Sequence, residues 1–401
     1  MPPTTVASDI MMKEMRISDM ADLKGTCLTR RRFVRLGLAA GLGFAAFPLF
    51  GCSGIFGSGN GAADGNTSSG DASGGASGSA GDAASQSGTT SLVPTVANGA
   101  DSEQRERVVF AFDTVVSLKA SATDEMMDAL EERCNYFESI FSRTIETSDI
   151  GRINAAGGSP VEVAAETADI IVKALDYCAE SEGRFDITIG AVSELWDFKK
   201  GVVPDAAALE EAIKHVDYRL VAVDGTKVAL DDAAAKLDLG GIAKGYIADD
   251  LCQMMAQSGV TSGFVNLGGN VKTVGCRPDG TAWHVGIQDP NSEEGTVIAA
   301  VYSEGTSAVT SGLYERAFEA DGKRYWHILD PKTGYPVETD LVSATVFSEA
   351  SLDGDGYTKP LFMMGAADAL SWLEAKDGIE GFLVDADGAI TQTSGCAAEL
   401  A

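Results

Sequence analysis

Between about Glu103 and Gln392, the hydrophobic positions follow two different spacings, which predict helices in some stretches and strands in others. Residues at helical spacing are Met126, Met127, Leu130, Cys134, Phe137 and Phe141, and again Ile170, Ile171, Ala174, Leu175 and Cys178. Apolar runs that predict strands are Val108–Leu118, Gly263–Val274, Trp283–Gln288, Val297–Tyr302, Lys323–Ile328, Leu341–Ser348 and Gly381–Val384. Helices that alternate irregularly with hairpin-like groups of strands favour an α+β fold over a doubly wound parallel sheet.

The stretch Leu237–Asp249 predicts a corner at which a ligand can bind. Its first half has the pattern of a buried strand end, Gly240 and Gly241 predict a turn, and a helix is expected from Ile247. A helix N-terminus with Lys244 beside it is suited to an anion, and Asp238 offers a carboxylate to a ribose, an adenine amine or a metal-bound water. The alternative is an ordinary strand-to-helix connection with a solvated lysine.

The N-terminal 52 residues have the pattern of an export signal. Thr29–Arg35 contains twin arginines, the apolar run Leu36–Leu49 follows, and Cys52 stands at the end of a lipobox-like sequence. Residues 1–52 therefore predict a twin-arginine signal peptide, and a mature protein anchored through lipid on the outer face of the cytoplasmic membrane. A short N-terminal membrane helix is the alternative interpretation.

The next segment, 53–102, is rich in Gly, Ser, Ala, Asp and Asn and has few large apolar residues. Such a composition cannot bury enough surface to offset its ordering entropy, so this segment predicts a flexible tether. The remaining residues, 103–395, are long enough for one large domain or two closely joined subdomains.

Charge and cysteine usage exclude several classes of function. A net charge of −29 makes nucleic acid and anionic lipid surfaces poor partners, so a bound phosphate needs a local cation or a helix N-terminus. The cysteines form no CxxC pair, which argues against a zinc site, and Cys134, Cys178 and Cys252 are expected to be buried thiols on helices. The sequence contains neither a dinucleotide-binding GxGxxG after a first strand nor a P-loop.

Several motifs in order along the chain together resemble the ApbE family of FAD:protein FMN transferases. The matching stretches are Phe141–Asn154, Phe185–Gly190 with Leu195–Phe198, Leu237–Asp249, Val265–Asn270, Thr310–Arg316 and His327–Gly334. The resemblance implies mixed or antiparallel sheets with packed helices, and an FAD cleft between two intimately joined subdomains.

The resemblance also implies the reaction and its participants. A Thr or Ser hydroxyl of an exported redox protein attacks the FMN phosphorus of FAD, FMN becomes attached through a phosphoester, and AMP leaves. Since this is phosphoryl transfer, positioning and charge neutralisation carry the catalysis. The implied cofactor is Mg²⁺, with Ca²⁺ or Mn²⁺ as alternatives, and FAD is the substrate.

The site residues that the resemblance implies fall into two sets. The metal would be held by the carbonyl of Gly241, the carboxylate of Asp355 and a hydroxyl shortly after it. At that last position this chain has Lys359, with Thr358 one residue earlier, so Thr358 either takes the role or Lys359 supplies part of the cation's charge. The FAD set is Phe112, Thr144, Arg184, Phe185, Asp186, Asp238, Lys244 and Leu329.

His327 is the candidate catalytic base for the incoming hydroxyl, a task suited to a pKa near neutrality. His215 and His284 are expected to be structural or exposed. Two further interpretations remain open from sequence alone: a metal-dependent FAD pyrophosphatase that yields FMN and AMP, and a flavin-binding lipoprotein without turnover, for which Lys359 and Thr144 are the best support.

Overall fold

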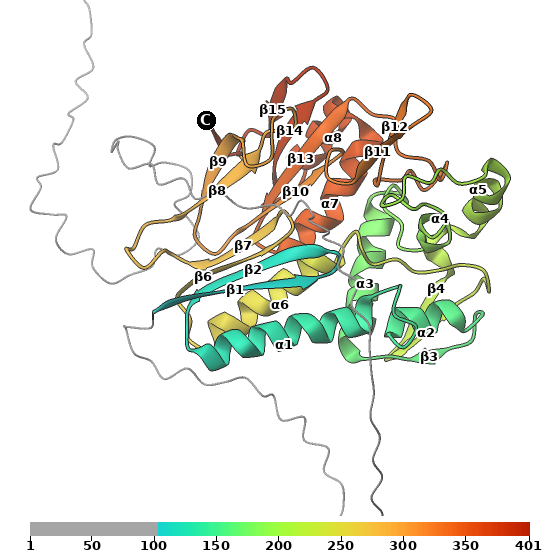
Figure 1. Cartoon of the computed structure of the whole chain (residues 1–401), viewed down its shortest axis with the longest axis horizontal. Coiled ribbons are helices and arrows are strands. Elements are labelled where there is room, and N and C mark those ends of the chain that lie inside the picture. Colours follow the sequence, from blue (N-terminus) through green and yellow to red (C-terminus); the bar gives the residue numbers. More distant parts are fainter. Residues whose placement is uncertain (1–102) are drawn as a thin grey trace, which may run out of the picture. The chain divides into compact units, whose positions relative to one another are not determined.

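An antiparallel sheet of eight strands forms the centre of the described structure (Figure 1). The structure is a computed structural model that describes residues 103–401; the predicted signal peptide and the tether lie outside the described residues. In spatial order the strands are β1 (Gln104–Ala111), β2 (Thr114–Ser121), β6 (Ser262–Leu267), β7 (Asn270–Gly275), β10 (Ser307–Gly312), β13 (Leu341–Ser348), β14 (Glu380–Asp385) and β15 (Ile390–Gln392).

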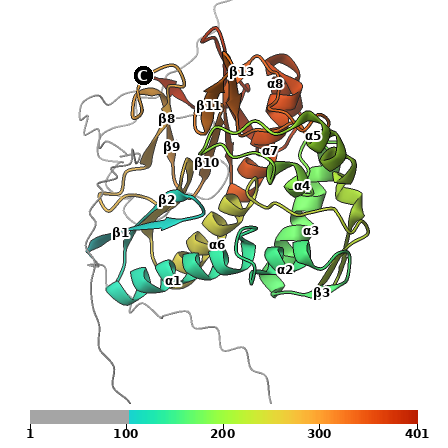
Figure 2. The ribbon, with the colours of Figure 1, turned by 45° about the vertical axis from the view of Figure 1, so that its right-hand side comes forward.

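Four helices pack along one face of this sheet, as Figure 2 shows for α1, α6, α7 and α8. They are α1 (Asp124–Phe141), α6 (Ala243–Gln257), α7 (Ser351–Met364) and α8 (Ala366–Glu374). The helical pattern expected from Met126 to Phe141 is confirmed, since each apolar residue of that pattern is buried on α1, and Thr123 caps the helix by accepting the Met126 N–H. Cys134, Cys178 and Cys252 are buried on helices, as expected.

The opposite face carries a smaller sheet over its C-terminal strands. This sheet has the order β16 (Glu399–Leu400), β9 (Val297–Ser303), β8 (Trp283–Gln288). Because side chains alternate along a strand, Phe382 and Val384 of β14 pack against Ile287 and Ala299 of the small sheet, whereas Leu383 packs among the helices. The central sheet is therefore buried on both faces here.

The remaining elements lie to one side of the sheet; those between residues 149 and 230 are green in Figure 1, and the hairpin at residues 317–326 is orange. The helices there are α2 (Asp149–Ala155), α3 (Ala165–Glu180), α4 (Gly190–Ser193), α5 (Ala206–Ala212) and the 3₁₀ turns η2 (Ile213–His215) and η3 (Tyr218–Leu220). The strands are β3 (Val161–Glu162), β4 (Val221–Asp224), β5 (Lys227–Leu230) and the hairpin β11 (Ala317–Ala320) and β12 (Lys323–Trp326). The α+β prediction with antiparallel sheets is confirmed. Within residues 103–401, no helix has the length and apolar character needed to cross a bilayer.

Two strand predictions were wrong in the same way. The expected single strands Val108–Leu118 and Gly263–Val274 are each a hairpin, with turns at Phe112-Asp113 and Gly268-Gly269. All four turn residues have positive φ, as the tight two-residue hairpin turn requires. Glycine adopts this conformation without strain, but Phe112 and Asp113 do not.

Candidate active site

The corner predicted at Leu237–Asp249 is present, but its helix begins earlier than expected. Residues 237–239 are extended without joining a sheet: Leu237 exchanges two hydrogen bonds with the Asn154 side chain, and Asp238 N–H donates to Ile187 O. The Leu239 carbonyl accepts the N–H groups of Ile242 and Ala243, so the chain turns there and α6 starts at Ala243 rather than Ile247. Lys244 is therefore in the first turn, where the helix dipole favours anions.

The absence of a side chain at Gly245 allows α6 to approach α7 closely. A Cβ at this position would lie 2.5 Å from Ser351 O and 2.8 Å from Leu352 Cα. Asp249, one turn further along α6, accepts the N–H groups of Ser351 and Leu352 at 2.8 and 2.9 Å. The N-terminal ends of the two helices are thus held side by side.

This approach buries Asp355 of α7 against the start of α6. Its side chain is 0% exposed, Oδ2 accepts the Gly245 N–H at 2.7 Å, and Oδ1 forms an ion pair with Lys359 Nζ. Burial alone would raise the pKa of Asp355, but the positive charges of Lys359 and Lys244 outweigh it and hold that pKa below its usual value. Lys244 in turn donates to Asn270 Oδ1 at 2.9 Å.

The loop after β10 closes the same region from the sheet side. Glu315 lies beside the β6–β7 turn, since a Cβ on Gly269 would be 3.7 Å from its Oε1. Arg316 donates to the carbonyl of Asp113 at 3.1 Å and so joins this loop to the strained β1–β2 turn. Two hairpin turns and the start of α6 therefore meet at one end of the sheet.

His327 also faces this group of cations. Its Nδ1 is buried without a hydrogen-bond partner, and its backbone N–H donates to Arg316 O. Burial, followed by the positive charges of Arg316, Lys244 and Lys359, lowers the pKa of His327 to about 3. The imidazole is therefore neutral, and this pKa lies below the near-neutral value that would suit a catalytic base.

Together these side chains form a positively charged group in a strongly acidic protein. We call Lys244, Arg316, Lys359, Asp355 and Glu315 the charged cluster. Three of its members are cations and two are carboxylates, and burial raises the pKa of Glu315 and lowers the pKa of Lys359. Such a cluster is suited to bind and polarise a phosphate group.

A model of the ApbE family matches residues 112–383 of this chain. The chain belongs to the ApbE family. A FAD:protein FMN transferase of Treponema pallidum is 32% identical over 293 residues, which cover 69% of this chain and 80% of the relative. A Klebsiella pneumoniae protein of the same name is 37% identical over 253 residues, which cover 62% of this chain and 78% of that one.

Two solved ApbE structures share the fold. The crystal structure of the ApbE protein from Thermotoga maritima has a TM-score of 0.68 at 32% identity, covering 73% of this chain and 97% of that one. The Pseudomonas stutzeri flavinyl transferase ApbE in its apo form has a TM-score of 0.64 at 27% identity, covering 73% and 95%.

Several residues implied by the ApbE resemblance lie in or against the cluster. Lys244, Asp355 and Lys359 belong to it, and His327 faces it. Gly241 lies at the preceding turn, where the Phe185 ring covers it so closely that a Cβ on Gly241 would be 2.9 Å from that ring. Phe112 is in the turn that Arg316 contacts through the next residue.

Asp238 forms a second group at the entry to α6. Its carboxylate accepts the Gly240 N–H at 2.9 Å and the Ser193 hydroxyl at 2.7 Å, and pairs with Arg143 at 3.0 Å. Thr144, next to Arg143, is exposed, and its hydroxyl shares a 3.0 Å hydrogen bond with that of Ser142. These side chains leave the Asp238 carboxylate only partly open to a ligand.

Two other implied residues, Asp186 and Arg184, form hydrogen bonds with residues outside the charged cluster. The buried Asp186 carboxylate accepts from the N–H and hydroxyl of Thr188 and from the Tyr218 N–H. Arg184 donates to Ser181 and Glu182 at the end of α3.

Two more implied residues are buried in packing contacts. Leu329 is buried in a hydrophobic group with Trp196, and its backbone forms a bridge to Pro336. Thr358 is fully buried, accepts a hydrogen bond from the Ser311 hydroxyl at 3.0 Å, and makes a long contact to the Asp355 carbonyl. Its hydroxyl therefore joins α7 to β10, while Lys359 is the residue that reaches the Asp355 carboxylate.

The other two histidines have structural surroundings, as expected. His215 Nδ1 lies 2.6 Å from Asp232 Oδ2, and His284 stacks on Tyr302. Sequence reasoning named neither Arg316 nor Arg143 as site residues. Arg143 lies within the stretch Phe141–Asn154, and Arg316 ends the stretch Thr310–Arg316. An arginine within such a motif is a candidate phosphate ligand, and this was the signal that could have indicated both residues.

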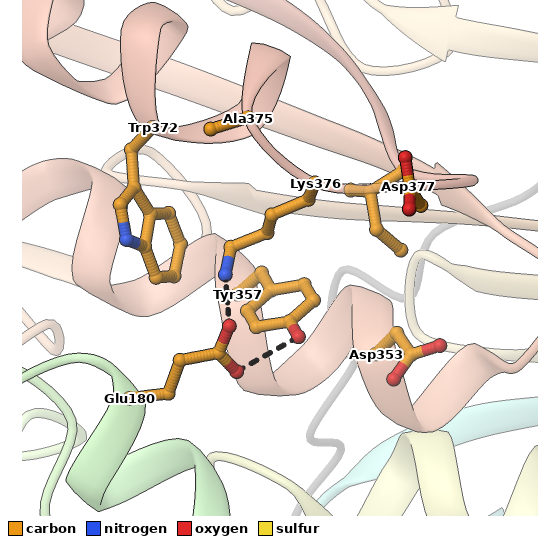
Figure 3. Close-up of a pocket in the computed structure, with 8 residues that line it drawn as sticks. Glu180, Asp353, Tyr357, Trp372, Ala375, Lys376 and Asp377 are labelled. Atoms are coloured by element: carbon orange, nitrogen blue, oxygen red, sulfur yellow. Dashed lines mark hydrogen bonds and ion pairs between the residues drawn. The ribbon is translucent and has the colours of Figure 1, made fainter.

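The described residues also line an open, polar cavity of about 340 Å³ (Figure 3). Lys376 lies between the rings of Trp372 and Tyr357 there, and both Lys376 and Tyr357 bond to Glu180. Asp353 and Tyr357 of α7 also line the cavity; Asp353 is two positions before Asp355, and Tyr357 is two positions before Lys359. Two positions are about 200° of helical rotation, so this cavity lies on the opposite side of α7 from the charged cluster.

Proposed function

We propose that this chain transfers FMN from FAD to a Thr or Ser hydroxyl of an exported protein and releases AMP. The observation that carries the proposal is the position of a neutral His327 beside Lys244, Arg316 and Lys359. This arrangement offers a proton acceptor and three phosphate-binding cations in one place. The FAD:protein FMN transferases of Treponema pallidum and Klebsiella pneumoniae support the same reaction.

In the proposed step, the acceptor hydroxyl oxygen bonds to the FMN phosphorus as the bond from that phosphorus to the bridging oxygen breaks. The bridging oxygen and its electron pair leave with AMP, and the hydroxyl proton passes to the buried ring nitrogen of His327. The cations hold the pyrophosphate in line with the attack and stabilise its charge. Burial and, after it, the same charges depress the His327 pKa, so a bound pyrophosphate that offsets the charges removes part of the depression and makes the imidazole a better base.

The remainder of FAD has candidate contacts on either side of the cluster. Phe112 and Thr144 are proposed near the isoalloxazine, and Asp238 is proposed for a ribose hydroxyl or the adenine amine. Phe185 acts by holding the Gly241 turn. Arg184, Asp186 and Leu329 support the walls of the site through the contacts that tie down their own segments.

The implied Mg²⁺, Ca²⁺ or Mn²⁺ does not fit the donors at Asp355. Both carboxylate oxygens of Asp355 already have partners, one of them the Lys359 ammonium, and the Thr358 hydroxyl accepts from Ser311 and donates to the Asp355 carbonyl. Within residues 103–401 no group of three or more His, Cys, Asp or Glu side chains could hold a metal ion. We therefore derive no step through a metal.

The sequence supports an exported, surface-tethered protein, and we propose that its partner is a redox protein on the same side of the membrane. A twin-arginine leader with Cys52 as lipid anchor, followed by the tether 53–102, would let the domain reach such a partner.

The test uses the purified chain, FAD and an acceptor fragment with one candidate threonine. A flavin-fluorescent acceptor band on a denaturing gel, with one AMP released per flavin attached, is the expected result. AMP and free FMN without a band would indicate the pyrophosphatase instead. Bound but intact FAD would contradict both enzyme functions and favour a flavin-binding protein.

A further inference from the structure

We infer that the Lys359 ammonium occupies the position beside Asp355 that a divalent cation would take, so that this chain cleaves FAD without a bound metal. The inference rests on the proposed function for its substrate, FAD. Its structural basis does not depend on the substrate. It is the arrangement of four groups around Asp355: the Gly245 N–H, Lys359, Lys244 and Thr358.

The first observation is the saturation of the Asp355 carboxylate. Asp355 is fully buried, Oδ2 accepts the Gly245 N–H at 2.7 Å, and Oδ1 contacts Lys359 Nζ at 2.5 Å. A divalent cation binding here would have to displace the ammonium, and then lie close to it and to Lys244. Two or more cations at such short separation in a buried site repel one another strongly.

The second observation is that Lys359 is an internal residue. Its side chain is 16% exposed, whereas a second Asp and Lys pair at the same spacing, Asp169 and Lys173 on α3, has side chains 46% and 45% exposed. An exposed pair of that kind contributes little, but a buried lysine keeps its charge only where it is paired. Lys359 is thus held in the site by its ion pair with Asp355.

The third observation is that the hydroxyl one residue before Lys359 is used elsewhere. Thr358 Oγ1 accepts from Ser311 at 3.0 Å in the contact between α7 and β10. Only the Gly241 carbonyl remains from the implied ligand set, and Mg²⁺ requires close to six oxygen ligands in near-octahedral geometry. An ammonium needs only acceptors for its three hydrogens, of which Asp355 takes one and the pyrophosphate oxygens can take others.

The experiment compares the wild-type chain with Lys359→Thr, and uses Lys173→Thr as the matched control at the exposed pair. Mn²⁺ binding without FAD is counted by electron paramagnetic resonance. AMP release from FAD is measured in excess EDTA and in excess Mg²⁺. We expect Lys359→Thr to bind one Mn²⁺ more per chain than wild type, and Lys173→Thr to bind no more than wild type.

In the activity assay, EDTA should change the wild-type and Lys173→Thr rates by less than about twofold. Lys359→Thr should lose at least about tenfold in EDTA and recover with Mg²⁺. A wild-type chain that loses its activity in EDTA, or a wild-type Mn²⁺ site that Asp355→Asn removes, would overturn the inference. The first of these outcomes is read on the wild-type protein alone, so misfolding of Lys359→Thr or Asp355→Asn would not obscure it.

If the proposed function is wrong, the same assays give a result that differs from those above. If wild type releases no AMP from FAD in either condition, FAD cleavage is ruled out, and the inference falls with it as stated. The Mn²⁺ comparison then still decides whether the ammonium fills the cation position.

Discussion

Asp355 Oδ2 accepts a hydrogen bond from the Gly245 N–H across 110 residues of sequence, at 2.7 Å. The bond caps the N-terminus of α6 with a carboxylate of α7, and it fixes Asp355 relative to Lys244. It depends on the close approach of the two helices, because Gly245 lies directly against Ser351 and Leu352.

Gly245→Ala tests this helix contact. A Cβ 2.5 Å from Ser351 O forces α6 and α7 apart, so we expect a loss of about 1–3 kcal/mol in the free energy of unfolding. Denaturant titration measures it, with Ala256→Ser at an exposed position of the same helix as the control. Equal stability of Gly245→Ala and wild type would show that the helices are not held this closely.

His327→Asn tests the proposed base. We expect transfer of FMN to fall by about 10²–10⁴-fold while the FAD dissociation constant stays within about threefold, because the lost group acts on the acceptor proton. His215→Asn removes a histidine bonded to Asp232 and should leave transfer unchanged. A parallel loss of FAD binding and transfer in His327→Asn would instead assign His327 to substrate binding.

The same substitution predicts a change in pH dependence. The His327 pKa is about 3 in the folded protein, against about 6.5 in an unfolded chain, so between these values the unfolded state binds more protons. Wild type should therefore lose up to about 1.4 kcal/mol more stability than His327→Asn for each pH unit between 6.5 and 3. Identical pH profiles of the two proteins would show that burial and the nearby cations do not depress this pKa.

Arg316→Gln tests the contribution of the loop after β10. Removal of a cation from the phosphate-binding group, and of its bond to the Asp113 carbonyl, should weaken FAD binding by about tenfold or more. Arg277→Gln, at an exposed arginine paired with Asp279, serves as the control and should bind FAD as wild type does. Fluorescence titration of FAD gives both constants, and equal constants would remove Arg316 from the site.

The strained β1–β2 turn yields a stability prediction. Asp113 has φ of 57°, so glycine should be more stable than alanine at this position by about 1 kcal/mol. Both substitutions remove the ion pair with Lys199, so their difference isolates the backbone conformation. Thermal unfolding of the two variants measures it, and an alanine variant at least as stable as the glycine variant would contradict the strain.

The sequence was informative where one local pattern decides the structure. The apolar spacing from Met126 to Phe141 defines one buried face, and α1 follows it. At Phe112 and Asp113 the local signal was misleading, because hairpin turns usually carry glycine or asparagine, and the run Val108–Leu118 is apolar enough to predict one strand.

Within the site, the sequence could not predict which side chains contact one another across the fold. The resemblance implied Lys244, Asp355 and His327 as site residues, but Thr358 and Lys359 both lie within one helical turn of Asp355. Only the packing of α7 on β10 shows that Thr358 meets Ser311 and that Lys359 meets Asp355. Similarly, Arg316 reaches the Asp113 carbonyl across 203 residues, a contact that no local pattern indicates.

We propose that His327 and the charged cluster transfer FMN from FAD to a protein hydroxyl. The most direct measurement is mass spectrometry of an acceptor protein after incubation with FAD and the purified chain, with AMP assayed in the same reaction. We expect an acceptor heavier by one FMN phosphoester at a single Thr or Ser, with equimolar AMP. An acceptor of unchanged mass alongside AMP and free FMN would contradict it.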